Sequence, residues 1–321
     1  MQPCMQTFLW PGRENSSHWL PRTERPWSIN MHPIPNRSDA IEFTPSPPDL
    51  QAYLNGLVVS EVMYNPSDNQ NLEFIELHNV GPMPLSIEHL QFSEGIEYSF
   101  ENAAITSLAT GAYVLVVRDI QAFEAHYGSG LPVAGEYRSS AVNNLSNEGE
   151  RITLSLGTGT GTVIRTFHYE NNAPWPEDAA GSGYSLTLIA PTHIPDHTLA
   201  GHWRGSVQAG GSPGQSDSLT FTGVPESDVN TNGIPDLIDY ALTEMPTGTL
   251  SDGVFEYMVN QRVGADAALV EVQVSFDLNA WFTHPAQLSE RNPARTSESY
   301  LRSYRVETEP YSAFRLRISL R

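Results

Sequence analysis

Residues 57–64 read LVVSEVMY, a run of branched and apolar side chains that closes at Asn65-Pro66. Its length and composition are typical of one β-strand. The next such stretch, EFIELHN at residues 73–79, alternates apolar and polar side chains before a Gly-Pro turn. Because successive side chains of a strand point to opposite faces, this alternation gives a sheet one apolar side. The two runs therefore predict strands of a sheet that buries one face.

Similar strand patterns recur as far as residue 189. They lie at residues 113–117, 151–156, 163–169 and 184–189. Two sheets with one apolar side each bury those sides by packing face to face. We therefore predict a β-sandwich of about seven strands over residues 57–217. Apolar residues at helical spacing in residues 120–127, followed by Gly128, predict a short helix at one end.

The composition agrees with an all-β chain. Hydrophobic residues make up 39% of the 321 residues, and Gly and Pro number 24 each. This length exceeds the roughly 100 to 200 residues of a typical domain. Because turn residues are abundant and long helical patterns are scarce, we expect about two or three domains of short strands.

The charge is strongly one-sided. There are 37 Asp and Glu against 17 basic residues, all of them Arg, which gives a net charge of -20. Nucleic-acid binding draws most of its affinity from basic groups, and anionic membranes repel an acidic surface. We therefore expect no nucleic-acid partner, and we expect dissolved cations to match this chain better.

The N-terminal sequence and the single cysteine bear on where in or outside the cell the protein is found. Cys4 is the only cysteine, so neither an intrachain disulfide nor a thiolate metal cage is expected. Residues 1–13 lack a secretory signal pattern, and no run approaches the ~18 apolar residues of a membrane span. Taken literally, these features describe a soluble cytoplasmic chain. The modular motifs described next lead us instead to expect a monomeric C-terminal piece of a longer exported protein, extracellular or at the cell surface, whose signal peptide lies upstream.

Residues 1–50 differ in texture from the rest, being rich in Pro, Arg, Trp and Ser. They include TPSPP at residues 44–48, a spacing of prolines that stiffens a chain. We expect the end of a truncated domain followed by a linker. Disordered polar sequence is the alternative for residues 1–30.

Six pieces of the sequence, including the two strand patterns quoted first, occur in a recognisable order. They are VVSEVMYNP at 58–66, EFIELHN at 73–79, GAYVLVVRD at 111–119, LSNEGE at 145–150, APWP with GSGYSL at 173–176 and 181–186, and WR with GGSPG at 203–204 and 210–214. Together they resemble the bacterial lamin-tail domain, an immunoglobulin-like β-sandwich. The resemblance implies a binding or architectural module of larger extracellular proteins, with no catalytic residues to carry over.

The resemblance departs from the family at residues 85–90, LSIEHL, where the family usually places a Gly-Trp pair. We expect Leu90 to fill that core position. Trp175, between two prolines, is expected to cover an open end of the sandwich, and Gly210-Gly211 is expected to adopt positive φ at a turn. A ligand platform is the alternative for these residues.

The sharpest chemical motif is DVNTNGIPDLID at residues 228–239, which has the spacing of a calcium loop. Ca²⁺ takes six to eight hard oxygen ligands. The predicted ligands are the side chains of Asp228, Asn230, Asn232, Asp236 and Asp239, with the main-chain carbonyl of Ile234. Gly233 occupies the position of the sharp turn. We therefore predict Ca²⁺ as the cofactor of this loop.

The residues after the loop predict a short helix that ends before Pro246, and no matching helix precedes it. The loop therefore resembles dockerin-type or thrombospondin-type repeats more than a paired EF-hand. Asp239 stands where Glu is usual, and its shorter carboxylate reaches the ion less easily. We predict weak affinity, on the order of 10⁻⁴ to 10⁻³ M, which suits calcium-rich surroundings. An Asp/Asn-rich linker without metal is the alternative.

The C-terminal part predicts a small antiparallel sheet or sandwich. Its expected strands lie at residues 255–259, 268–276, 300–306 and 314–320. Residues 274–281, VSFDLNAW, resemble a strand and turn found near the ends of modular bacterial exported proteins. The predicted domains are thus residues 1–50, a partial segment and linker; 51–217, the lamin-tail-like domain; 218–250, the calcium-loop linker; and 251–321, the C-terminal β-domain.

We predict that the chain is not an enzyme. No nucleophile elbow, zinc HExxH motif, Walker loop or dinucleotide fingerprint occurs. His193, His197 and His202 share one loop, which offers no rigid frame for a metal. Glu73 and Glu76, three residues apart on a strand, point to opposite faces and cannot share a substrate.

A glycan-binding or adhesion module is therefore the leading hypothesis, with a cell-surface glycan or protein as partner. A passive spacer beside a catalytic domain is its rival, and a hydrolase is the minor alternative.

Overall fold

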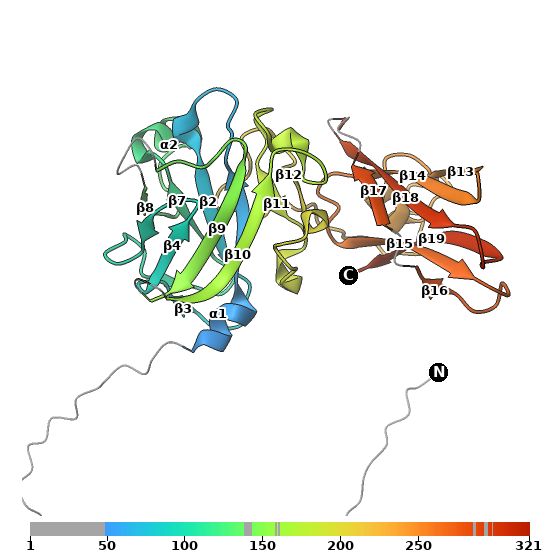
Figure 1. Ribbon diagram of the computed structural model, residues 1–321, viewed down its shortest axis with the longest axis horizontal. Coiled ribbons are helices and arrows are strands. Elements are labelled where there is room, and N and C mark those ends of the chain that lie inside the picture. Colours follow the sequence, from blue (N-terminus) through green and yellow to red (C-terminus); the bar gives the residue numbers. More distant parts are fainter. Residues whose placement is uncertain are drawn as a thin grey trace, which may run out of the picture. The chain divides into compact units, whose positions relative to one another are not determined.

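The computed structural model describes residues 49–137, 143–157, 159, 161–284, 287–291, 295–296 and 298–321. The predicted N-terminal segment, as far as residue 48, lies outside the described residues. Pro47–Arg321 form one compact unit. Within it, two β-sandwiches follow one another along the chain, the first in blue to yellow and the second in orange to red (Figure 1).

The first sandwich contains a six-stranded sheet with the order β12-β11-β1-β2-β7-β8. Its strands are β1 (Leu57–Met63), β2 (Phe74–Asn79), β7 (Tyr113–Val117), β8 (Val133–Glu136), β11 (Leu186–Leu188) and β12 (Trp203–Gly205). All neighbours are antiparallel except β7 and β8, which are parallel. The strand predicted at residues 57–64 therefore lies at the centre of this sheet.

The second sheet of this sandwich has the order β10-β9-β4-β5. Its strands are β4 (Leu90–Glu94), β5 (Tyr98–Ser99), β9 (Gly149–Leu156) and β10 (Thr162–Glu170), and a separate short pair joins β3 (Leu85–Ser86) to β6 (Ser107–Leu108). Leu90 is buried in the shared core, as expected where the family usually has Trp. The prediction of an all-β, immunoglobulin-like fold is confirmed.

Helices occupy the ends and the outer face of the first sandwich. They are α1 (Leu50–Gly56), α2 (Ile120–Tyr127) and the 3-10 turns η1 (Gln70–Leu72), η2 (Glu177–Ala179), η3 (Pro191–His193) and η4 (Ala200–His202). The Asp119 side chain accepts a hydrogen bond from Ala122 N at 2.9 Å and caps α2, which ends at Gly128 with φ of 89°. Phe123 of α2 packs against Phe74, so this predicted helix covers the side of the sheet away from the main core.

The second sandwich pairs a four-stranded sheet, β13-β14-β18-β17, with a three-stranded sheet, β16-β15-β19. The strands are β13 (Thr247–Ser251), β14 (Val254–Arg262), β15 (Ala268–Ser275), β16 (Phe282–Thr283), β17 (Gln287–Arg291), β18 (Ser299–Glu307) and β19 (Ala313–Leu320). The expected strands correspond to β14, β15, β18 and β19. The alternation predicted for residues 268–276 stops early, because Phe276 lies beyond β15 and is 52% exposed.

Candidate functional site

The side chains of the predicted calcium loop partly converge. Asn230 Nδ2 and Asn232 Nδ2 both donate hydrogen bonds to Asp239 Oδ2, at 2.7 and 2.8 Å. Asp239 lies in the first turn of the short helix α3 (Asp236–Ala241), so α3 fixes the point on which both amides meet. The structure thus brings three of the predicted ligands together.

The other predicted ligands stabilise the turn itself. Asp228 accepts hydrogen bonds from the N–H groups of Asn232, at 3.0 Å, and of Gly233, at 2.7 Å. Gly233 has φ of 86°, as a sharp turn at this position requires. Asp236 accepts from Val229 N at 3.0 Å, and its second carboxylate oxygen is buried without a hydrogen-bond partner among the described residues.

The chemistry of these donors fits a hard cation. In this conformation the amide oxygens of Asn230 and Asn232 accept hydrogen bonds from Asn232 N at 3.0 Å and from Ile234 N at 2.8 Å. A half turn of both amides would exchange these bonds for oxygens directed toward an ion beside Asp239. In the described part of the chain, no three His, Cys, Asp or Glu side chains are placed to hold a metal ion by themselves. Asp228, Asp236 and Asp239 therefore do not converge in this conformation. A cation here depends on the two amide oxygens and the Ile234 carbonyl as well.

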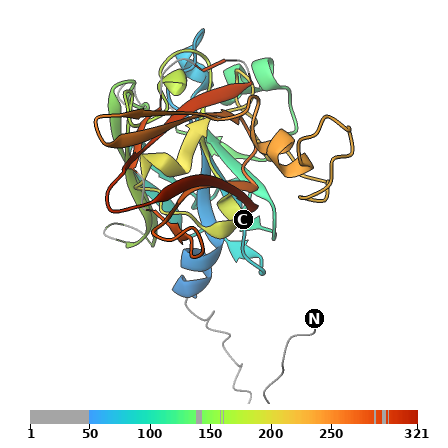
Figure 2. The ribbon, with the colours of Figure 1, turned by 90° about the vertical axis from the view of Figure 1, so that its right-hand side faces the viewer.

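The loop is anchored to the second sandwich. Leu237 and Ala241 of α3 are buried against Val259 and Val272 in the core between its two sheets. Arg262, at the end of β14, donates hydrogen bonds to three carbonyls at the end of this segment. They belong to Asp239 (3.0 Å), Tyr240 (3.1 Å) and Leu242 (3.3 Å). Figure 2 shows α3 and the preceding loop, in golden orange, at the side of the ribbon. The motif is therefore built into a folded domain.

Buried ions join the two sandwiches. Arg204, on β12 of the first, is 2% exposed and donates to Asp266 of the second through Nε at 2.8 Å and Nη2 at 2.7 Å. It also pairs with Asp217, in the segment between the sandwiches. Burial opposes the charge of this guanidinium, but the ion pairs with Asp266 and Asp217 raise the pKa of Arg204 above its usual value.

A second ionic contact lies beside the first. Arg295 pairs with Asp178 of the first sandwich at 2.8 Å, and the Tyr300 hydroxyl donates to the same carboxylate oxygen at 2.7 Å. The Arg295 guanidinium also stacks over the ring of Tyr184, 3.8 Å from its centre. Arg295, Asp178 and Tyr300 carried no motif signal in the sequence, because a lone residue of these types has no characteristic spacing.

A cleft of about 490 Å³ opens between the two sandwiches. Its walls include the rings of His78 and Tyr113, which stack at 4.0 Å, together with Phe221 and Arg321. His78 is 6% exposed, and its Nδ1 has no hydrogen-bond partner within the described ranges. Burial lowers the pKa of His78 to about 4, so the ring is neutral at pH 7.

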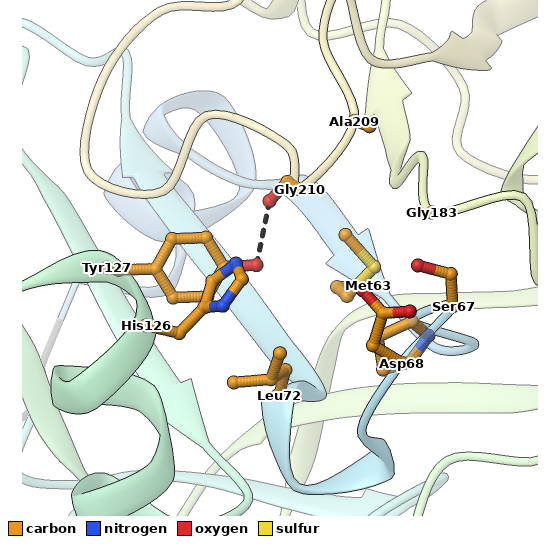
Figure 3. Close-up of a pocket in the computed structure, with 10 residues that line it drawn as sticks. Met63, Ser67, Asp68, Leu72, His126, Tyr127, Gly183, Ala209 and Gly210 are labelled. Atoms are coloured by element: carbon orange, nitrogen blue, oxygen red, sulfur yellow. Dashed lines mark hydrogen bonds between the residues drawn. The ribbon is translucent and has the colours of Figure 1, made fainter.

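A smaller pocket of about 160 Å³ contains the residue types of a hydrolytic triad: Ser67, Asp68 and His126. Figure 3 shows Ser67 and Asp68 on one side of this pocket and His126 on the other. The hydrogen bond marked among the drawn residues joins Tyr127 Oη to the Gly210 carbonyl, at 2.8 Å. A nucleophile and base must lie within hydrogen-bonding reach of each other, and this arrangement does not provide that.

Two of the three histidines in the loop at residues 190–202 make contacts within the fold. His197 is 4% exposed, and its Nε2 accepts a hydrogen bond from Val59 N at 3.2 Å. His202 Nδ1 lies 2.8 Å from the Asp196 carbonyl. The carboxylates of Glu73 and Glu76 have separate partners, Tyr137 Oη at 2.9 Å and Gly214 N at 2.6 Å, as expected for opposite faces.

Comparison with known proteins identifies part of the chain. Residues 51–171 match the family model of the lamin tail domain, a family of non-enzymatic modules. The match covers β1 to β10, and the motifs at residues 173–214 lie beyond it, although β11 and β12 complete the same sheet. Neither curated proteins nor solved structures give a match. No helix in the described residues is long and apolar enough to span a membrane.

Proposed function

Taking residues 51–171 as a lamin tail domain, we propose that the chain is the non-catalytic, extracellular tail of a larger bacterial surface or secreted protein. In this proposal the two sandwiches form one architectural unit, and Ca²⁺ bound by residues 228–239 stabilises the second. The observation that carries the proposal is the position of α3, because its apolar side chains fill the core while Asp239 stands at the centre of the loop.

Ion binding and folding are coupled through this helix. A ligand that binds the folded state stabilises it by RT ln(1 + [L]/Kd), about 1.4 kcal/mol when the concentration is ten times Kd. A dissociation constant near 10⁻⁴ M gives this effect at about millimolar calcium, the range in which extracellular modules operate. Loss of calcium then loosens the second sandwich without unfolding the first.

Thermal unfolding in calcium and in chelator tests the proposal. We expect about 2 mM CaCl₂ to raise the Tm of the full chain by a few degrees over EGTA. Asp228→Asn with Asp239→Asn should remove the part of this difference that the loop contributes. Asp252→Asn is the matched control, since it removes an exposed carboxylate in the β13–β14 turn of the same sandwich. An equal calcium response in loop variant and control rejects the loop as the site.

Ligand binding in the cleft is a second candidate function, favoured by the stacked rings of His78 and Tyr113 in its wall. The cleft volume lies within the usual range for small-molecule sites, about 300 to 1,000 Å³, and its mixture of rings and polar atoms suits a glycan. A glycan array on the wild type and on Phe221→Ala tests this. Binding lost in the variant supports a glycan site, and an array without any hit on the wild type favours the passive spacer.

A further inference from the structure

A row of polar side chains crosses the six-stranded sheet. Glu76 on β2 pairs with Glu61 on β1, Glu61 pairs with Thr187 on β11, and Thr187 pairs with Arg204 on β12. Their neighbours along the strands, such as Leu186 and Trp203, belong to the main core, so the row lies on the opposite face. In an open sheet such a face is solvated.

Here the row is covered by the segment that leads to the second sandwich. Glu61 and Glu76 are each 1% exposed. Glu61 accepts hydrogen bonds from Ser212 N at 2.9 Å, from Ser212 Oγ at 3.2 Å and from the Ser185 hydroxyl. Glu76 accepts from Ser60 Oγ at 2.6 Å and from Gly214 N at 2.6 Å. The two carboxylates are thus enclosed, and every donor that contacts them is neutral.

Positive charge does not compensate this pair. In the described parts of the chain, no ion pair joins Glu61 or Glu76 to an Arg or a His, and Arg204 is taken up by Asp217 and Asp266. Buried charges are costly unless an opposite charge or a metal accompanies them.

A cavity lies against the two carboxylates. Its volume is about 20 Å³, room for one water-sized particle, and its walls include Glu61, Glu76 and Thr187 with the hydroxyls of Ser60 and Ser212. Thr187 is 6% exposed, and its Oγ1 has no hydrogen-bond partner among the residues the structure describes. An unpartnered hydroxyl in such a place needs a further partner, a water molecule or an ion.

The donor atoms around the cavity decide which kind of ion fits it. Carboxylate and hydroxyl oxygens, without His or Cys, are the ligands of hard cations rather than of zinc or copper. Tyr113, Pro191 and Ser216 line this cavity and also the large cleft between the sandwiches, so the cavity borders the cleft. Because Ser212 and Gly214 lie in the covering segment, an ion here also ties that segment to the sheet.

We propose that the cavity between Glu61, Glu76 and Thr187 is a second cation site, for Ca²⁺ or a similar hard divalent ion, distinct from the loop at residues 228–239. Each glutamate has oxygen lone pairs beyond those used in the hydrogen bonds above, and Thr187 supplies a neutral oxygen. The ion neutralises the buried pair and fixes the segment that carries the second sandwich. This second site shares no residue with the loop at residues 228–239.

Isothermal titration of the full chain with CaCl₂, and in parallel with MgCl₂, tests the proposal. The loop variant Asp228→Asn with Asp239→Asn should still bind about one ion per chain. Adding Glu61→Gln and Glu76→Gln should abolish this remaining binding. Thr187→Val, which removes only the hydroxyl and keeps shape and charge, should weaken it several-fold and remains informative if the glutamine variant does not fold.

The matched control is Glu73→Gln in the loop variant, because Glu73 is equally buried but pairs with Arg118. It should leave the stoichiometry unchanged. A loop variant that binds no divalent ion overturns the proposal, as does binding that survives both the glutamine pair and Thr187→Val. If Glu61→Gln has a higher Tm in chelator than the chain with Glu61, and neither takes up an ion, a proton shared between Glu61 and Glu76 stabilises the two carboxylates. That result rejects the cation site.

Discussion

Replacing Arg204 by Met is expected to destabilise the protein more than any single surface change. The guanidinium makes two bonds to Asp266, at 2.8 and 2.7 Å, and pairs with Asp217 and with the Asp217 carbonyl at 3.0 Å. Met has similar length but no charge, so both carboxylates become buried and unpaired. Removing one partner of a buried ion pair costs about 3 to 5 kcal/mol. Because Arg204 serves two carboxylates, we expect the upper part of this range.

Differential scanning calorimetry and urea unfolding measure this loss. A shift of about 2 to 4 °C in Tm per kcal/mol, appropriate to domains of this size, predicts a fall of roughly 10 °C or more. The two sandwiches should also separate into two transitions, since the ion pair of Arg204 with Asp266 is then lost. Among the described residues, only the ion pair of Arg295 with Asp178 then still joins them. Arg204→Lys, which keeps the charge without the planar fork, should lie between wild type and Arg204→Met. A variant within 1 kcal/mol of wild type with a single transition refutes the reasoning.

Three smaller predictions follow from the first sandwich and α3. Burial lowers the pKa of His197 from 6.5 to about 3, so the unfolded chain binds more protons than the folded chain between these pH values. The free energy of unfolding should therefore fall by about 1.4 kcal/mol for each pH unit below pH 6.5. Urea unfolding of the His197→Gln variant should lack this pH dependence. Gly211 has φ of 76° and an added Cβ there would meet the Glu61 carboxylate, so Gly211→Ala should lower the free energy of unfolding in urea by about 1 to 3 kcal/mol. Gly201→Ala is the control and should be nearly neutral, because an added Cβ at Gly201 would meet no atom of the described residues within 4 Å. Leu237→Ala should lower the free energy of unfolding by about 2 to 5 kcal/mol in the same assay, because the buried Leu237 side chain packs α3 against the core. The same change should reduce the rise in Tm that calcium produces.

Local pattern in the sequence was sufficient for α2 and for β1, β2, β7, β9, β10 and β11 of the first sandwich, although its strands run from β1 to β12 where about seven were predicted. The helix expected at residues 120–127 is α2 without change, because a capping Asp, helical spacing and a terminal Gly agree there. The strand expected at residues 113–117 is likewise β7. Short strands such as β5 and β6 carry too few residues to show alternation, and they form because longer neighbours offer an edge.

The polar row and the ion clusters were not predictable in this way. Alternation on β1 and β11 marks Glu61 and Thr187 as facing away from the core, which normally means solvent. They are buried because residues 211–218 fold back over the sheet on their way to the second sandwich, and no local pattern encodes that path. The candidate ligands at residues 228–239 could be named because their spacing is itself the signal, while the burial of α3 in a core required the structure.

The central claim is that residues 228–239 bind calcium through side chains that α3 holds in place. NMR spectroscopy of the Asn230 and Asn232 side-chain amides and of the Gly233 N–H during a CaCl₂ titration tests it at the residues concerned. We predict that these signals shift together and saturate with a Kd on the order of 10⁻⁴ to 10⁻³ M, as both amides turn their oxygens to the ion. Signals that stay unchanged up to about 10 mM calcium, well above that range, contradict the account.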